Sequence, residues 1–105
     1  MRDESSSKQD PSAGLVSRIP WHVVEVRPLP GLRLAVRFAD GLTGEVELAN
    51  LILGPRAGIF EQLRDPALFA RVRIDHGAVS WPGDIDLAPD AMHDEISASG
   101  QWVIE

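Results

Sequence analysis

The sequence predicts a small α+β domain in which antiparallel strands pack one apolar face against short helices, in the order β-β-β-α-β-β-α. Three observations lead to this fold class. Apolar and polar residues alternate with period two over residues 21–48 and again over 71–81. Apolar residues recur at helical spacing between and after these stretches. The chain has 105 residues, which suits one domain of ordinary small size.

The first three strands are expected over residues 21–27, 32–38 and 42–48. A loop of residues 39–41 with Gly41 in the left-handed conformation joins the second strand to the third. In this register the apolar residues of one face lie opposite each other: Phe38 and Leu42, Val36 and Gly44, Leu34 and Val46, Leu32 and Leu48. The other face then carries Arg33 opposite Glu47, with Arg37 diagonal to Glu45, and we expect it to be solvent-exposed.

Short helices and two more strands are expected in the second half. Ile59, Phe60 and Leu63 would share one face of a first helical segment. Asp65 would cap a second one that begins at Pro66. Strands over 71–75 and 79–81 follow, joined at Gly77, and a last helix would begin near Pro89 with Met92 and Ile96 facing inward.

The domain boundaries follow from composition. Residues 1–20 are mostly polar with balanced charge, so we expect a flexible leader before a domain over 21–96. Residues 97–105 are expected to form a C-terminal tail. Acidic residues are concentrated near that end of the chain, within a net charge of −6.

Composition also limits the function. The chain has no cysteine, which excludes disulfides and thiolate metal sites and favours a reducing cytoplasm. Its apolar runs are too short to cross a membrane or to form a signal peptide. A charge of −6 predicts weak attraction to nucleic acid and to anionic membranes. We expect no cofactor, no membrane contact and no direct binding of nucleic acid.

Four motifs carry a resemblance to a known family. They are Trp21-x-x-Val24-x-Val26-x-Pro28, Phe38-x-Asp40-Gly41, the segment from Ile59 to Phe69 around Asp65-Pro66, and Trp81-Pro82-Gly83-Asp84-Ile85-Asp86-Leu87-x-Pro89-Asp90. Over residues 21–96 the chain resembles the domain of unknown function 2442 family. The resemblance implies a small bacterial or archaeal α+β domain without an assigned catalytic residue, often encoded beside another small protein in a layout suggestive of a toxin–antitoxin pair. The helix-turn-helix that follows the domain in some members is not found here.

One cluster has the residue types of a metal site. Asp84, Asp86, Asp90, His93 and Asp94 lie within eleven residues, and carboxylates with imidazole can hold Ca²⁺, Mg²⁺ or Mn²⁺. The spacing does not match a calcium-binding loop. The alternative, which we favour, is that these residues form a turn and the start of a helix.

Two groups of residues are candidates for binding a partner. The first is a basic patch that suits an acidic partner, made of Arg56, Arg64, Arg71 and Arg73. Its alternative is pairing of these arginines with Glu61 and Asp65. The second is Trp81 beside Asp84 and Asp86, an apolar anchor with an acidic rim that suits a basic partner. Its alternative is that Trp81 belongs to the core.

These observations predict a cytoplasmic, non-catalytic interaction module whose partner is a small protein. The family resemblance implies a regulatory, antitoxin-like role. A metal- or ligand-dependent enzyme built on the cluster from Asp84 to Asp94 is the alternative.

Overall fold

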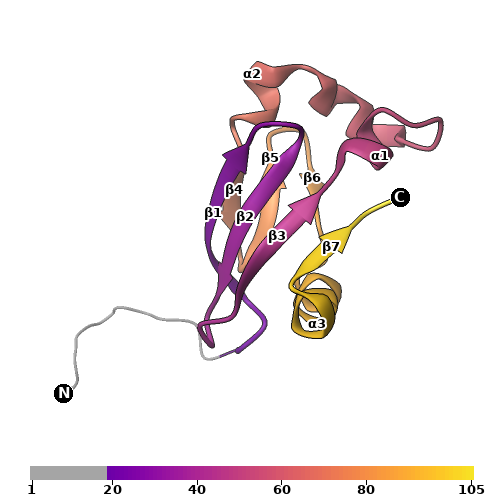
Figure 1. Ribbon diagram of the computed structural model, residues 1–105. Coiled ribbons are helices and arrows are strands. Elements are labelled where there is room, and N and C mark those ends of the chain that lie inside the picture. Colours follow the sequence, from indigo (N-terminus) through magenta and orange to yellow (C-terminus); the bar gives the residue numbers. More distant parts are fainter. Residues whose placement is uncertain (1–18) are drawn as a thin grey trace.

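The computed structural model describes residues 19–105. Along the chain its elements are β1 (Val23–Leu29), β2 (Arg33–Phe38), β3 (Thr43–Glu47), α1 (Ala49–Ile52), the 3₁₀ helix η1 (Gly58–Arg64), α2 (Pro66–Phe69), β4 (Arg73–Asp75), β5 (Ala78–Trp81), β6 (Ile85–Asp86), α3 (Pro89–Ser99) and β7 (Gln101–Val103) (Figure 1). The α+β class predicted from the sequence is confirmed. Most of the expected leader, residues 1–18, lies outside the described residues.

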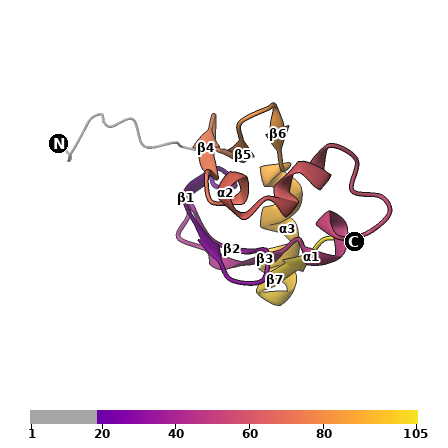
Figure 2. The ribbon, with the colours of Figure 1, turned by 90° about the horizontal axis from the view of Figure 1, so that it is seen from above.

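Two sheets enclose the core. The larger sheet has the order β1-β2-β3-β7 and the smaller one β4-β5-β6. Seen from above, the sheets lie on opposite sides, and α3 closes the side between β6 and β7 (Figure 2). The opposite side is closed by a hydrogen bond of 2.9 Å from the Val23 amide in β1 to the Gly77 carbonyl between β4 and β5. Fully buried side chains come from both sheets and from α1, η1 and α3: Leu34, Phe38, Val46, Leu48, Ile52, Leu63, Trp81, Ile85, Met92 and Ile96.

The β2–β3 hairpin has the predicted register. Val36 lies opposite Gly44 and Leu34 opposite Val46, and Gly41 is in the left-handed region with φ +93°. The Asp40 carboxylate accepts a 3.0 Å hydrogen bond from the Leu42 amide, which fixes the loop. The alternation of polar and apolar residues therefore predicted the register of this hairpin correctly.

Strand β1 departs from simple alternation. Its pairing with β2 shifts between Val23 and Glu25, where one extra residue is accommodated as a bulge. As a result Val23 is buried in the core and Val26 packs against it, whereas Val24, which the alternation placed on the same face as Val26, is half-buried and outside the core cluster. The bulge sets which β1 side chains face solvent next to β2.

The helical segment after α1 also differs from expectation in one residue. Ile59 was expected inward with Phe60 and Leu63, but it is 46% exposed. The reason is that η1 is a 3₁₀ helix, whose three-residue period aligns Phe60 with Leu63 and turns Ile59 away. The cap of α2 is confirmed, since the Asp65 carboxylate accepts from the Ala67 amide at 3.0 Å.

The C-terminal residues form a strand, so the expectation of a tail over 97–105 is wrong. Helix α3 extends to Ser99 and ends at Gly100, which has φ +83°. This left-handed residue reverses the chain, and β7 then pairs in parallel with β3, with Trp102 beside Val46. Met92 and Ile96 are buried as predicted.

Replacement of Gly41 tests the hairpin loop. No atom lies within 4 Å of the position a Cβ would take, so the cost of a side chain there is conformational. Gly41→Val should lower the free energy of unfolding by about 1–3 kcal/mol, because a β-branched residue is strained at positive φ. Gly41→Asn is the control and should cost less, since Asn tolerates this region. Equal urea midpoints for wild type and Gly41→Val would contradict the assigned loop.

Candidate functional site

Trp81 is a core residue and not a surface anchor for a partner. Its side chain is 0% exposed, and its indole N–H donates a 3.0 Å hydrogen bond to the Phe69 carbonyl. The Phe69 ring packs beside it with centroids 5.9 Å apart. A side chain without exposed surface offers nothing to a partner, so the alternative reading of Trp81 as part of the core is the correct one.

The acidic residues near Trp81 do not converge on a common point. Asp84 lies in the turn between β5 and β6 with φ +62°, and the Asp90 carboxylate accepts from the Ala91 amide at the start of α3. Asp84 and Asp86 are exposed, as candidates for contact with a basic partner must be. Among residues 19–105, no three His or acidic residues are grouped closely enough to hold a metal ion, so the structure does not support the candidate set Asp84, Asp86, Asp90 and His93.

His93 instead belongs to a latch between α3 and the β2–β3 hairpin. Its Nε2 lies 2.8 Å from Asp40 Oδ2, and its ring meets the Phe38 ring edge-on with centroids 4.8 Å apart. Only 18% of the His93 side chain is exposed. The pKa of Asp40 is lowered, first by the hydrogen bond from the Leu42 amide and then by the one to His93. The pair therefore serves to fix α3 to the hairpin.

The four candidate arginines do not form one basic patch. Arg64 donates to the carbonyls of Ile52 at 2.7 Å and Gly54 at 3.4 Å, and it pairs with Glu61. It thereby provides hydrogen-bond donors to carbonyl groups at and just after the C-terminal end of α1. Arg56, Arg71 and Arg73 are exposed. Both ribbon views place the loop before η1, which carries Arg56, on the far side of the molecule from β4, which carries Arg73 (Figures 1 and 2).

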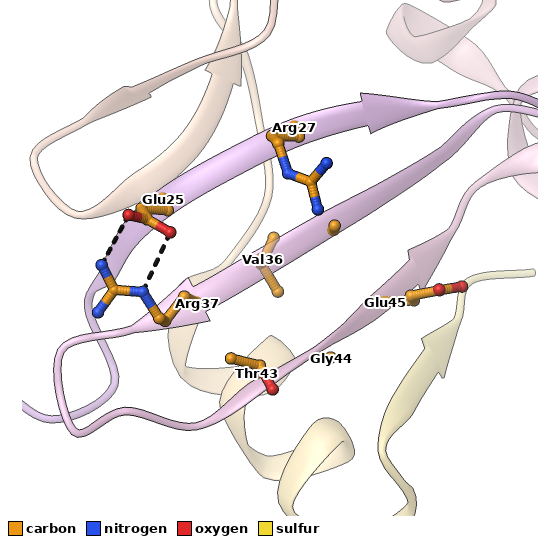
Figure 3. A pocket seen from close by; sticks show the side chains of 8 residues that line it. Glu25, Arg27, Val36, Arg37, Thr43, Gly44 and Glu45 are labelled. Atoms are coloured by element: carbon orange, nitrogen blue, oxygen red, sulfur yellow. Dashed lines mark hydrogen bonds and ion pairs between the residues drawn. The ribbon is translucent and has the colours of Figure 1, made fainter.

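The structure brings a different set of charges together on the solvent side of the larger sheet. We call this surface the outer face and define it by Glu25, Arg27, Arg33, Ala35, Arg37, Thr43 and Glu45. An open hollow of about 310 Å³ lies on it, with Ala35 and Thr43 as small residues among the charged ones (Figure 3).

Ion pairs hold most of the charged side chains of the outer face in place. Arg37 pairs with Glu25 through two contacts: Nη2 lies 2.7 Å from Glu25 Oε2, and Nε donates to Glu25 Oε1 at 3.1 Å (Figure 3). This contact lowers the pKa of Glu25 and raises that of Arg37, so both remain charged. Arg33 pairs with Glu45 at 2.9 Å, although the sequence had placed it opposite Glu47. The register was correct, but the long arginine side chain reaches a diagonal partner.

Arg27 differs from these two arginines. It lies opposite Ala35 in the β1–β2 register, and its guanidinium extends over β2 (Figure 3). It forms no ion pair with any residue from 19 to 105, although its charge contributes to lowering the pKa of Glu25. The position of Arg27 beside Ala35 depends on the β1 bulge, so the alternation of residues alone does not predict it. The sequence feature that could have indicated an exposed Arg27 is the alternation of Glu25 and Arg27 with the valines of β1.

Comparison with known proteins assigns a family. Residues 23–98 match the sequence profile described as "Protein of unknown function (DUF2442)". The chain belongs to the DUF2442 family. No curated protein and no solved structure matches it. Within residues 19–105, no helix of this DUF2442 domain combines the length and apolarity needed to cross a bilayer.

The contacts of the Asp40 carboxylate, first with the Leu42 amide and then with His93, predict a pH dependence. Because the folded-state pKa of Asp40 is lowered, its charge stabilises the fold above the unfolded pKa of about 4, and this contribution is lost as the pH falls through the folded pKa. Asp40→Asn should therefore be less stable than wild type in urea at pH 5, and the difference should narrow progressively below about pH 4.

Asp75→Asn is the matched control. Asp75 lies 3.1 Å from His76, but the His76 side chain is 97% exposed and joins no second element. Its urea midpoint should follow wild type at every pH. A constant difference in urea midpoint between Asp40→Asn and wild type from pH 5 to the acid limit would contradict a stabilising role for the Asp40 charge.

Proposed function

We propose that this DUF2442 protein is a cytoplasmic, non-catalytic interaction module that binds an acidic segment of a small protein partner on its outer face. The observation that carries this proposal is the Arg27 guanidinium, which extends over β2 from the position opposite Ala35 and has no carboxylate partner among the described residues. A guanidinium offers five N–H donors in a planar fork that matches a carboxylate.

The surroundings of Arg27 favour a carboxylate from another molecule. Arg33 and Arg37 are already engaged by Glu45 and Glu25, which orients them and leaves Arg27 as the donor available in the hollow. Ala35 lies opposite Arg27 and lines the hollow, and its small side chain leaves space for an incoming side chain. Charge-assisted hydrogen bonds of this kind are about twice as strong as neutral ones. An Asp or Glu of a partner strand is therefore the chemistry that the hollow suits best.

The antitoxin-like role rests on the family resemblance. A gene layout suggestive of a toxin–antitoxin pair makes the neighbouring small protein the first partner to test. A non-catalytic role is supported by His93, whose Nε2 is bound to Asp40, and by the separation of the residues on which the enzyme alternative depends. The exposed Asp84 and Asp86 would contact basic groups of the same partner, without Trp81 as an anchor.

Calorimetric titration with the neighbouring gene product tests the proposal. Arg27→Gln should weaken binding about tenfold or more, because a charge-assisted contact contributes about 1.5–3 kcal/mol. Arg73→Gln is the control, since it removes the same charge from an exposed position in the smaller sheet. The affinity of Arg73→Gln for the neighbouring gene product should stay within about twofold of that of wild type. Higher salt should weaken wild-type binding and reduce the difference between wild type and Arg27→Gln.

Equal effects of Arg27→Gln and Arg73→Gln would contradict the outer face as the binding site. Absence of any binding to the neighbouring gene product would contradict the antitoxin-like role. In that case a peptide of alternating Glu and Val, titrated against wild type and Arg27→Gln, tests the outer face by itself. In wild type the peptide should shift the backbone amide NMR signals of residues 27 and 35. In Arg27→Gln the same peptide should shift neither signal.

A further inference from the structure

Strand β7 ends the larger sheet with an open edge. It pairs with β3 on one side, and no helix or strand of residues 19–105 pairs with its other side (Figure 1). Open edges are usually protected by charges, prolines, bulges or short length. Strand β1, at the other edge, has a bulge and Pro28, and β6 is only two residues long. Strand β4 has three residues, as β7 does, but two of them are the charged Arg73 and Asp75. Residues 101–104, in contrast, contain neither a charge nor a proline.

The backbone of β7 is ready to accept another strand. The Ile104 amide donates to the Glu47 carbonyl, and the Glu45 amide donates to the Gly100 carbonyl, so even-numbered residues of this segment face β3. Backbone groups alternate in direction along a strand. The N–H and C=O of Val103 therefore point away from the sheet, and the Val103 side chain is 37% exposed.

We propose that a second copy of this chain binds along β7, antiparallel to it and related by a two-fold axis at Val103, so that the two larger sheets become one continuous sheet. Val103 then lies opposite Val103 of the second copy and Gln101 opposite Glu105. This register provides about six N–H···O hydrogen bonds across the edge. It also places no like charges opposite each other.

The side chains of β7 are self-complementary in this register. Trp102 and Ile104 face the core side, where they pack against the core but remain only half-buried. Antiparallel pairing places Trp102 of each copy opposite Ile104 of the other, at a non-hydrogen-bonded position where side chains approach most closely. The two exposed flanks would cover each other, and the two cores would meet. This complementarity favours a second copy over an unrelated strand.

Net charge gives this association a distinctive salt dependence. Each copy carries −6, so the copies repel each other at long range. Added salt screens this repulsion and should strengthen association through β7. The effect is opposite in sign to that expected for an acidic partner on Arg27, which separates the two surfaces experimentally.

Sedimentation equilibrium of the full chain tests the proposal. The mass should rise from 11.5 kDa toward twice that value as the concentration increases to about 1 mM, and the transition should move to lower concentration with added salt. A mass that stays at 11.5 kDa throughout would overturn the proposal.

Val103→Pro removes the N–H at the two-fold axis. This N–H points away from β3, so the proline leaves the β3–β7 hydrogen bonds in place. The variant should remain at the monomer mass with an unchanged circular dichroism spectrum. Val103→Thr, which keeps the N–H and the branched side chain, is the control and should associate within about twofold of wild type. Association of Val103→Pro equal to wild type would overturn the proposal.

Cross-linking tests the register directly, because the natural chain contains no cysteine. Opposed residues at a hydrogen-bonded antiparallel position have Cα atoms about 5.5 Å apart, within the range that a disulfide spans. Val103→Cys should form a covalent dimer under mild oxidation. Thr43→Cys, exposed on β3 outside the segment paired with β7, is the control and should stay monomeric. Equal cross-linking of both variants would overturn the register, as would its absence in Val103→Cys.

Discussion

The close contact between α3 and β3 at Gly44 is the constraint on which the rest of this structure depends. A Cβ atom on Gly44 would lie 2.5 Å from Ile96 Cγ2 and 2.7 Å from the Gly100 carbonyl oxygen. Only a residue without a side chain lets the helix approach the sheet this closely. The contact buries Ile96 against the core side of the sheet and holds the end of α3 where Gly100 can direct the chain into β7.

This arrangement determines which surfaces remain for function. The core side of the larger sheet is filled by α3 and by the smaller sheet, and the latch from His93 to Asp40 fixes the helix at the hairpin end. Two surfaces that this packing leaves open in residues 19–105 are the outer face with Arg27 and the edge of β7. The first offers a charged group without a partner among the described residues, and the second offers backbone groups. The two surfaces therefore suit partners of different chemistry.

Local features of the sequence were sufficient to predict the β2–β3 hairpin, the Asp65 cap and the inward face of α3. Each is set by residues within a few positions of one another, such as the loop at Gly41 and the spacing of Met92 and Ile96. Features that depend on contacts distant in sequence were missed or misassigned. Strand β7 needs β3, more than fifty residues earlier, and the pairing of Arg37 with Glu25 needs the β1 bulge. Trp81 had two plausible environments because Pro82-Gly83 marks the end of a strand, whether or not the strand is buried.

Amide hydrogen exchange of a Gly44→Ala variant tests the central role of this contact most directly. If α3 must approach β3 at Gly44 for β7 to pair, the Ile104 amide, which donates to Glu47, should exchange about tenfold faster or more than in wild type. The Phe38 amide, which donates to Leu42 within the hairpin, should exchange at an unchanged rate. Thr43→Ala, at the neighbouring exposed position, should alter neither rate. Unchanged exchange at Ile104 in folded Gly44→Ala would show that β7 is held independently of this contact, and would contradict the account.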